Sequence, residues 1–280
     1  MNPTLTPLEA ARIADDAEAL AFADLFDAAP APLRDTLGLR VERIADATLL
    51  LAPGLPTPMF NRAMGLGLVR PADESAVAAI ADTYRGAGIG AWWLHWNPLA
   101  APADLPARLA AQGYTPPARR SWAKMLHGRE APPAMPTGLG VAPARDDQIA
   151  AVTRAIARAF EMPPFMADWL AALHGRAGWR TYAVADGDEV VGGGCLFQTG
   201  HETGTLAWLG MGAVLPSHRR RGGQGALMAR RIADAIADGA LHVVTETGEA
   251  MAGEPNPSLG NMQRCGFVRV ASRLNFAAPA

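Results

Sequence analysis

The chain has 280 residues, a length that suits two domains, each able to bury a hydrophobic core. Half of the residues are hydrophobic, 19% are charged, and the net charge is −2, so no global positive charge favours nucleic acid or an anionic membrane. The two cysteines, Cys195 and Cys265, predict a reduced, cytoplasmic setting. No histidine pair has metal-ligand spacing and no apolar run could span a bilayer, so we expect neither a metal nor a membrane partner.

The first half of the chain is predicted as one domain over residues 1–130. Hydrophobic periodicity and turn residues predict helices and strands in alternation. They are a helix over 21–29 and the stretch before it, a hairpin over 39–53, a helix over 75–88, a strand over 91–98, a helix over 103–113 and a strand over 119–127. The following stretch, 128–140, is rich in proline and glycine, and it predicts a linker at 131–138.

The second predicted domain covers residues 139–280 and has clearer periodicity. Its predicted elements are a strand at 139–145, helices at 146–160 and 165–173, a hairpin at 180–197, a strand at 205–214, a helix at 225–239, a strand at 241–247, a helix at 257–265 and a strand at 267–276. The order β-α-α-β-β-β-α-β-α-β combines an antiparallel run with a β-α-β crossover. This order predicts an α/β class with a mixed sheet.

One segment, "VLPSHRRRGGQGALM" (214–228), combines charge with bare backbone. It lies between a predicted strand and a predicted helix, whose first turn has N–H groups without helical partners and a partial positive charge. Glycines let a ligand approach that backbone closely, and arginines add forked donors for phosphate oxygens. We therefore expect a diphosphate or polyphosphate to bind here. The candidate residues are Arg219, Arg220, Arg221, Gly222, Gly223, Gln224, Gly225 and Ala226.

The same segment resembles the acyl-CoA loop of the GCN5-related N-acetyltransferases (GNAT). That family has Val-x-Pro, then Arg or Gln, two residues, Gly, one residue, and Gly or Ala before a helix. "VLPSHRRRGG" fits this pattern to Gly222, with Gln224 at the next family glycine, whereas a shift of one residue aligns Arg220, Gly223 and Gly225. The late "NMQRCGFVRV" is also similar to the family's last helix, Gly-Phe and strand. Both registers place the same loop amides around a pyrophosphate.

The resemblance implies a GNAT-like fold in the second half and acetyl-CoA as co-substrate. The pantetheine arm would bond to backbone near Ala213 and Val214. Asn256, Ser258 and Asn261 could contact CoA, although Asn256 or Ser258 could instead cap the last helix. The motif Gly113-Tyr114 repeats the layout of Gly266-Phe267, which favours a second, degenerate GNAT-like copy in the first half, without a cofactor.

The catalytic residues depart from the family's usual pattern. Met262 stands where the family often has a tyrosine acid, and the strand at 205–214 carries no acid. Glu246 and Glu249 follow the next strand and are the candidate catalytic residues; the alternative is that they are solvent-exposed loop acids. The predicted function is acetyl transfer from acetyl-CoA to a small-molecule amine. The alternative is a non-catalytic acyl-CoA sensor or interaction module.

Overall fold

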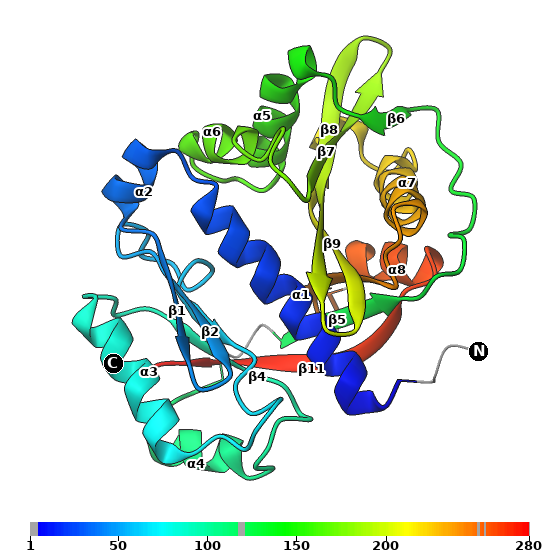
Figure 1. Ribbon diagram of the computed structural model, residues 1–280. Helices are drawn as coiled ribbons and strands as arrows, with labels where there is room; N and C mark the ends of the chain where they lie inside the picture. Colours follow the sequence, from blue (N-terminus) through cyan, green and yellow to red (C-terminus); the bar gives the residue numbers. More distant parts are fainter. Residues whose placement is uncertain (1–4, 117–120, 251–252, 255, 280) are drawn as a thin grey trace. The chain divides into compact units, whose positions relative to one another are not determined.

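The computed structural model describes residues 5–116, 121–250, 253–254 and 256–279, and these residues form two compact units (Figure 1). Unit 1 consists of Met1–Lys124, Glu246–Asn256 and Arg269–Ala280. Unit 2 consists of Met125–Thr245 and Pro257–Val268. The boundary falls inside three strands, β5 (Ser121–His127), β10 (His242–Gly248) and β11 (Val268–Ala277). Each unit is therefore built from more than one stretch of sequence.

Along the first half of the chain, the described residues of unit 1 form four helices and four complete strands. They are α1 (Pro7–Asp27), α2 (Ala31–Leu37), β1 (Arg40–Ile44), β2 (Ala47–Leu51), β3 (Arg62–Met64), α3 (Glu74–Gly86), β4 (Trp93–Trp96) and α4 (Leu105–Ala111). α1 begins with a capping box, in which Thr6 and Glu9 satisfy each other's backbone N–H groups. Its strands follow the order β1-β2-β3-β4-β11-β5, and β11 pairs antiparallel with β4.

The sheet of unit 1 has one apolar face and one polar face, because successive side chains of a strand point to opposite sides. The apolar face contributes Ala63, Leu94 and Phe276 to a core that also holds Ile80 and Tyr84 of α3. On the alternate positions of the same strands stand polar residues, all buried: Arg62, His95, Arg273 and Asn275. Acidic residues of α1 bond to this polar face, as described below.

Unit 2 contains the remaining elements in the predicted order. They are β6 (Gly140–Pro143), the 3-10 turn η1 (Asp146–Gln148), α5 (Ile149–Ala159), α6 (Phe165–Ala171), β7 (Trp179–Asp186), β8 (Glu189–His201), β9 (Gly204–Val214), the 3-10 turn η2 (Pro216–His218), α7 (Gly223–Ala237) and α8 (Pro257–Arg264). The strand order is β10-β9-β8-β7-β6, with antiparallel pairs from β6 to β9. β10 pairs parallel with β9, and α7 makes the crossover between them.

The predicted mixed α/β class is confirmed by this arrangement, and each predicted element of the second half is present within a few residues. In the first half, the sequence missed α2 and the short strand β3, and residues 119 and 120 of the predicted strand 119–127 lie outside the part that the structure describes. The predicted second domain, 139–280, includes 246–256 and 269–280, which belong to unit 1. The domain bounds at 130 and 139 therefore stay a prediction.

Candidate active site

The predicted phosphate loop joins the end of β9 to the start of α7 in unit 2. β9 ends at Val214, η2 follows, and Gly222 is the N-cap of α7 with φ +80°. This left-handed conformation suits glycine, since a Cβ there would meet the following carbonyl oxygen. The first closed hydrogen bond of the helix runs from Ala226 N to Gly222 O, 3.0 Å. The N–H groups of Gly223, Gln224 and Gly225 therefore precede the helical ladder, and Gly222 has no side chain to accept from them.

These residues line a pocket of about 640 Å³ in unit 2. Ala213 and Val214 at the end of β9 form part of its wall, and Ser258 and Asn261 of α8 form another part. The pocket is also lined by Met135, Ala159, Phe160, Gly212, His218, Arg219, Arg220, Gly222, Gly223, Gln224, Gly225, Pro257 and Arg264. Most of the predicted cofactor-binding residues are thus brought together around one cavity, although Ala226 donates its N–H inside α7.

The three arginines of the loop have different surroundings. Arg219 and Arg220 line the pocket and are exposed. Arg221 instead pairs with Asp186, with its Nη1 2.6 Å from Oδ2 and its Nη2 3.2 Å from Oδ1. Asp186 lies at the turn between β7 and β8, and His218 Nε2 is 3.5 Å from the same Oδ2. The three arginines predicted at the phosphate site are therefore divided between the pocket and a carboxylate.

The predicted linker also borders this loop, which the sequence did not indicate. The Thr137 hydroxyl donates to Arg221 O at 2.6 Å and accepts from Leu139 N at 3.1 Å. A Cβ on Gly222 would overlap the carbonyl oxygen of Pro136, and one on Gly225 would lie 2.5 Å from Met135 Cε. In Figure 1 this segment is the green stretch between β5 and β6 that runs past α7.

Gln224 links the start of α7 to α8. Its Nε2 donates to Ser258 Oγ at 3.2 Å, and its Oε1 accepts from Asn261 Nδ2. Ser258 and Asn261 were predicted on the resemblance alone, and both bond to Gln224, which departs from the family glycine in one of the two registers. Asn256 belongs to unit 1, where its Nδ2 donates to Thr247 Oγ1 at 3.1 Å and to Gly248 O.

A bulge in β9 lies close to the end of the strand. Cys195 of β8 pairs with Gly210, but Gly193 pairs with Ala213, so β9 has one extra residue between these pairs, and Met211 has φ +55°. Arg231 of α7 is buried behind it and donates to Cys195 O at 2.9 Å and to Gly210 O at 3.0 Å. Burial lowers the pKa of Arg231 to about 10. Sequence reasoning missed this residue, although an arginine beside the apolar Leu227 and Ile232 was a usable signal.

The two candidate catalytic residues both lie in unit 1. Glu246 Oε2 is 3.1 Å from Lys124 Nζ, and its side chain is only 9% exposed. Burial, with the nearby Glu18, raises the pKa of Glu246 despite the opposing effect of Lys124. Glu249 accepts from Arg269 Nη1 at 3.0 Å and from Ser272 Oγ. Neither glutamate is the solvent-exposed loop acid of the alternative interpretation.

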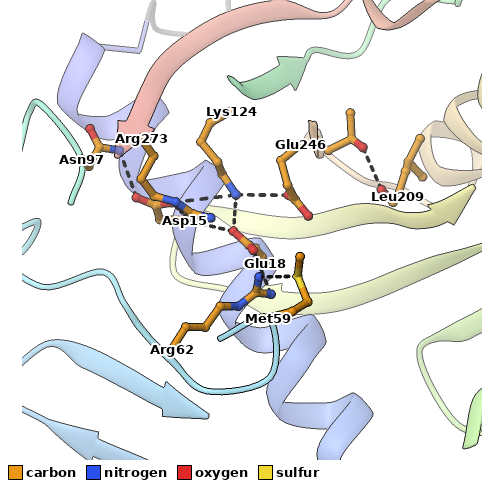
Figure 2. Close-up of polar contacts among 10 residues, drawn as sticks. Asp15, Glu18, Met59, Arg62, Asn97, Lys124, Leu209, Glu246 and Arg273 are labelled. Carbon is orange, nitrogen blue, oxygen red and sulfur yellow. Dashed lines mark hydrogen bonds and ion pairs between the residues drawn. The ribbon is translucent and has the colours of Figure 1, made fainter. Parts of the chain in front are cut away.

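Glu246 is one member of a buried polar cluster in unit 1 (Figure 2). Lys124 Nζ lies 2.7 Å from Glu18 Oε2, and Arg273 Nη1 lies 2.6 Å from the same oxygen and 2.7 Å from Asp15 Oδ1. Arg62 Nη2 is 3.1 Å from Glu18 Oε1. Burial raises the pKa of Glu18, but the three cations outweigh burial and hold it well below its ordinary value.

Two further side chains of the polar face have no hydrogen-bond partner in unit 1. His95 and Asn275 are paired across β4 and β11 and are fully buried, and within the described part of the chain their ring and amide atoms make no hydrogen bond. Burial, with the charges of Arg273 and Arg62, lowers the pKa of His95 well below its ordinary value. His95 is therefore neutral in the folded protein.

Within the described ranges, no group of three or more His, Cys, Asp or Glu is placed to hold a metal ion. Over the same ranges, no helix is both long and apolar enough to cross a membrane.

Comparison with known proteins finds a family model that matches part of the chain and solved structures with a similar fold over most of it. Residues 147–267 match the family model described as "Acetyltransferase (GNAT) family". No curated protein matches the chain by sequence. The fold is similar to that of a GCN5-related N-acetyltransferase from Kribbella flavida, with 17% identity, 94% of this chain and 96% of that chain covered, and a TM-score of 0.62.

Two other solved structures extend this likeness. A tandem GNAT protein from the clavulanic acid biosynthesis pathway has 17% identity, covers 83% of this chain and 78% of its own, and gives a TM-score of 0.59. A GCN5-related N-acetyltransferase from Sphaerobacter thermophilus is 18% identical. The match covers 98% of this chain and 93% of that chain, with a TM-score of 0.56. At these identities the likeness concerns the fold, and it extends over both halves of the chain, as the predicted tandem arrangement requires.

Proposed function

We propose that the chain transfers an acetyl group from acetyl-CoA to a small-molecule amine, in keeping with the match of residues 147–267 to the family model described as "Acetyltransferase (GNAT) family". The observation that carries this proposal is the start of α7. There the left-handed Gly222 leaves the amides of Gly223 to Gly225 ahead of the helical ladder, and Arg219 and Arg220 line the same pocket. This set of donors suits a pyrophosphate.

The backbone also favours one of the two registers of the loop motif. The residue that needs glycine for its conformation is Gly222, whereas Gly223 and Gly225 lie inside α7. We therefore propose the register that pairs Arg219 with Gly222. In that register Gln224 replaces the second family glycine, and its amide is already bonded to Ser258 and Asn261. Ser258 and Asn261 then position Gln224 beside the cofactor as well as lining the pocket.

Acetyl-CoA would supply an activated acyl group, which a deprotonated amine can attack directly. The backbone of Ala213 and Val214 would bond the pantetheine arm as an added strand. A backbone N–H at the bulge of β9, braced by Arg231, would polarise the thioester carbonyl. Asn256 is proposed as a further CoA contact.

Glu246 and Glu249 remain the proposed catalytic carboxylates, and their surroundings favour Glu246. Burial and the nearby Glu18 raise the pKa of Glu246, which is the direction of shift that suits a general base. Glu249 instead accepts from Arg269 and Ser272. The pH profile of turnover compared for Glu246→Gln and Glu249→Gln separates them, since only loss of the base removes the ascending limb of the profile. A pH profile of turnover that is unchanged in both variants would exclude both glutamates as the general base.

A non-catalytic acyl-CoA sensor is the second candidate function, and Met262 is the observation that favours it. Met262 is buried in α8 where the family often has its tyrosine acid. Release of free CoA thiol across a panel of amines distinguishes the two functions. Thiol release that depends on an amine supports the transferase, and acetyl-CoA binding without release supports the sensor. We also propose a cytoplasmic location, because Cys195 and Cys265 are both free and buried.

A further inference from the structure

The segment Met135–Thr137, here named the strap, touches the phosphate loop at three consecutive residues. Met135 covers Gly225, Pro136 O faces Gly222, and the Thr137 hydroxyl donates to Arg221 O. A Cβ on Gly222 would collide with the backbone of the strap at Pro136 O, and one on Gly225 would displace the end of the Met135 side chain. Glycine at positions 222 and 225 therefore leaves room for the strap as well as for a ligand, and the strap packs directly against the loop.

Thr137 controls the orientation of one particular peptide group. In a trans peptide, the carbonyl of Arg221 and the N–H of Gly222 point in opposite directions. The hydroxyl of Thr137 holds this carbonyl at 2.6 Å, so it also fixes the Gly222 N–H on the side away from the strap. Leu139 N donates to the same hydroxyl at 3.1 Å, which holds the hydroxyl itself in place.

The side chain of Arg221 is also bonded within unit 2. Both of its terminal nitrogens donate to Asp186, which is the fork geometry that fixes an arginine in one orientation. Asp186 also lies 3.5 Å from His218, at the other end of the loop. One carboxylate on the β7–β8 turn thus contacts both ends of the stretch that contains Arg219 and Arg220.

We propose that the strap is a part of the CoA site, in which Thr137 and Asp186 are positioning residues, Arg221 is an anchor, and only Arg219 and Arg220 contact phosphate. This inference rests on the proposed function. The loop amides and the two pocket arginines are useful to a pyrophosphate only while the loop keeps its conformation, and preorganisation of this kind improves affinity without any added contact. The strap adds Met135 to the pocket wall directly.

The affinities for CoA and for pantetheine, which lacks the phosphates, test the inference in the full chain. Thr137→Val removes the hydroxyl at nearly constant volume, and Thr137→Ser retains it. We expect Thr137→Val and Asp186→Asn each to weaken CoA about fivefold to tenfold, the effect of one hydrogen bond. Pantetheine affinity stays unchanged, and Thr137→Ser binds CoA like the wild type. Urea unfolding of each free variant identifies a general loss of stability, which lowers both affinities together.

The sign of the Asp186→Asn effect is the sharpest result. If Arg221 instead bound phosphate in competition with Asp186, loss of the Asp186 carboxylate would free the Arg221 guanidinium and tighten CoA binding. Tighter or unchanged CoA binding in Asp186→Asn overturns the inference, and so does an equal loss for CoA and pantetheine in Thr137→Val. Failure of the wild type to bind CoA overturns the proposed function together with the inference. If the wild type binds CoA and the variants bind it with the same affinity, the inference is wrong and the proposed function stands.

Discussion

The ammonium group of Lys124 lies 2.7 Å from Glu18 Oε2 in the interior of unit 1. Lys124 is the only lysine in the chain, and its side chain is fully buried. Burial of a charge is unfavourable unless oppositely charged groups surround it, and here the carboxylates of Glu246, at 3.1 Å, and Asp15, at 3.8 Å, also lie beside the ammonium. The polar cluster therefore holds α1 to the sheet only while its charges balance.

Replacement of Lys124 by methionine should destabilise the protein strongly. The carboxylates of Glu18 and Glu246 would stay buried without their shared ammonium, and loss of one partner of a buried pair typically costs about 3–5 kcal/mol. The free energy of unfolding in urea measures the loss. Lys124→Arg retains the charge and serves as the matched control, with a smaller loss. A Lys124→Met variant as stable as the wild type would show that the cluster contributes no net stability.

Stability should also fall as the pH is lowered from 7.5 to 5.5. Burial, with Arg273 and Arg62, lowers the pKa of His95 well below its ordinary 6.5, so the unfolded chain binds a proton in this window and the folded protein does not. The expected slope approaches about 1.4 kcal/mol per pH unit below pH 6.5. His242, whose pKa burial also lowers, adds an effect of the same sign.

The control for this prediction is His95→Gln, which leaves His242 in place. Urea unfolding at several pH values should show a shallower slope for this variant than for the wild type. Equal slopes would mean that His95 accepts a proton inside unit 1 without loss of stability. Glu18 affects stability at lower pH. Its pKa is lowered in the folded protein, so its contribution to the free energy of unfolding is lost only as the pH falls below 4.5, the ordinary pKa of a glutamate.

Alanine at Gly222 should weaken CoA binding more than tenfold. The left-handed conformation costs an ordinary residue roughly 1–2 kcal/mol, and the new Cβ would overlap Pro136 O. Gly239, at the other end of α7, is a matched control because it has φ +91° but no atom within 4 Å of a new Cβ. Gly239→Ala should lose comparable stability in urea and bind CoA normally. If both variants bind CoA equally well, the conformation at Gly222 does not serve the ligand.

The three arginines should respond differently to salt. Arg219→Ala and Arg220→Ala each remove a proposed phosphate contact, so each should weaken CoA by roughly 10–100-fold and reduce the salt dependence of its affinity. Arg221→Ala should weaken CoA less and leave the salt dependence as it is, because its charge is already paired with Asp186. Calorimetric titrations at two salt concentrations measure both quantities. A loss of salt dependence in Arg221→Ala would contradict its assignment as an anchor.

The second half of the chain could be predicted well because its local signals agree with its tertiary structure. The hydrophobic spacing in α5 and α7, and the glycines at 222 and 239, are visible in one stretch of sequence each. The loop was recognised for the same reason, since strand, glycine and helix follow one another directly.

The residues that sequence reasoning missed depend on contacts between distant segments. Thr137 and Asp186 are separated from Arg221 by 84 and 35 positions, so no local pattern connects them. Lys124 and Glu18 are 106 positions apart, and only the fold shows that α1 brings Glu18 to Lys124. The strand β11 was predicted, but its pairing with β4 in unit 1 follows from topology, which periodicity does not encode.

The most direct test of the central claim is a calorimetric titration of the wild-type protein with acetyl-CoA, repeated with the Arg219→Ala, Arg220→Ala double variant. The account predicts saturable one-to-one binding to the wild type and a loss of at least tenfold in the double variant, since both arginines line the pocket at the start of α7. No heat of binding with the wild type, or equal affinity in the two proteins, would contradict it.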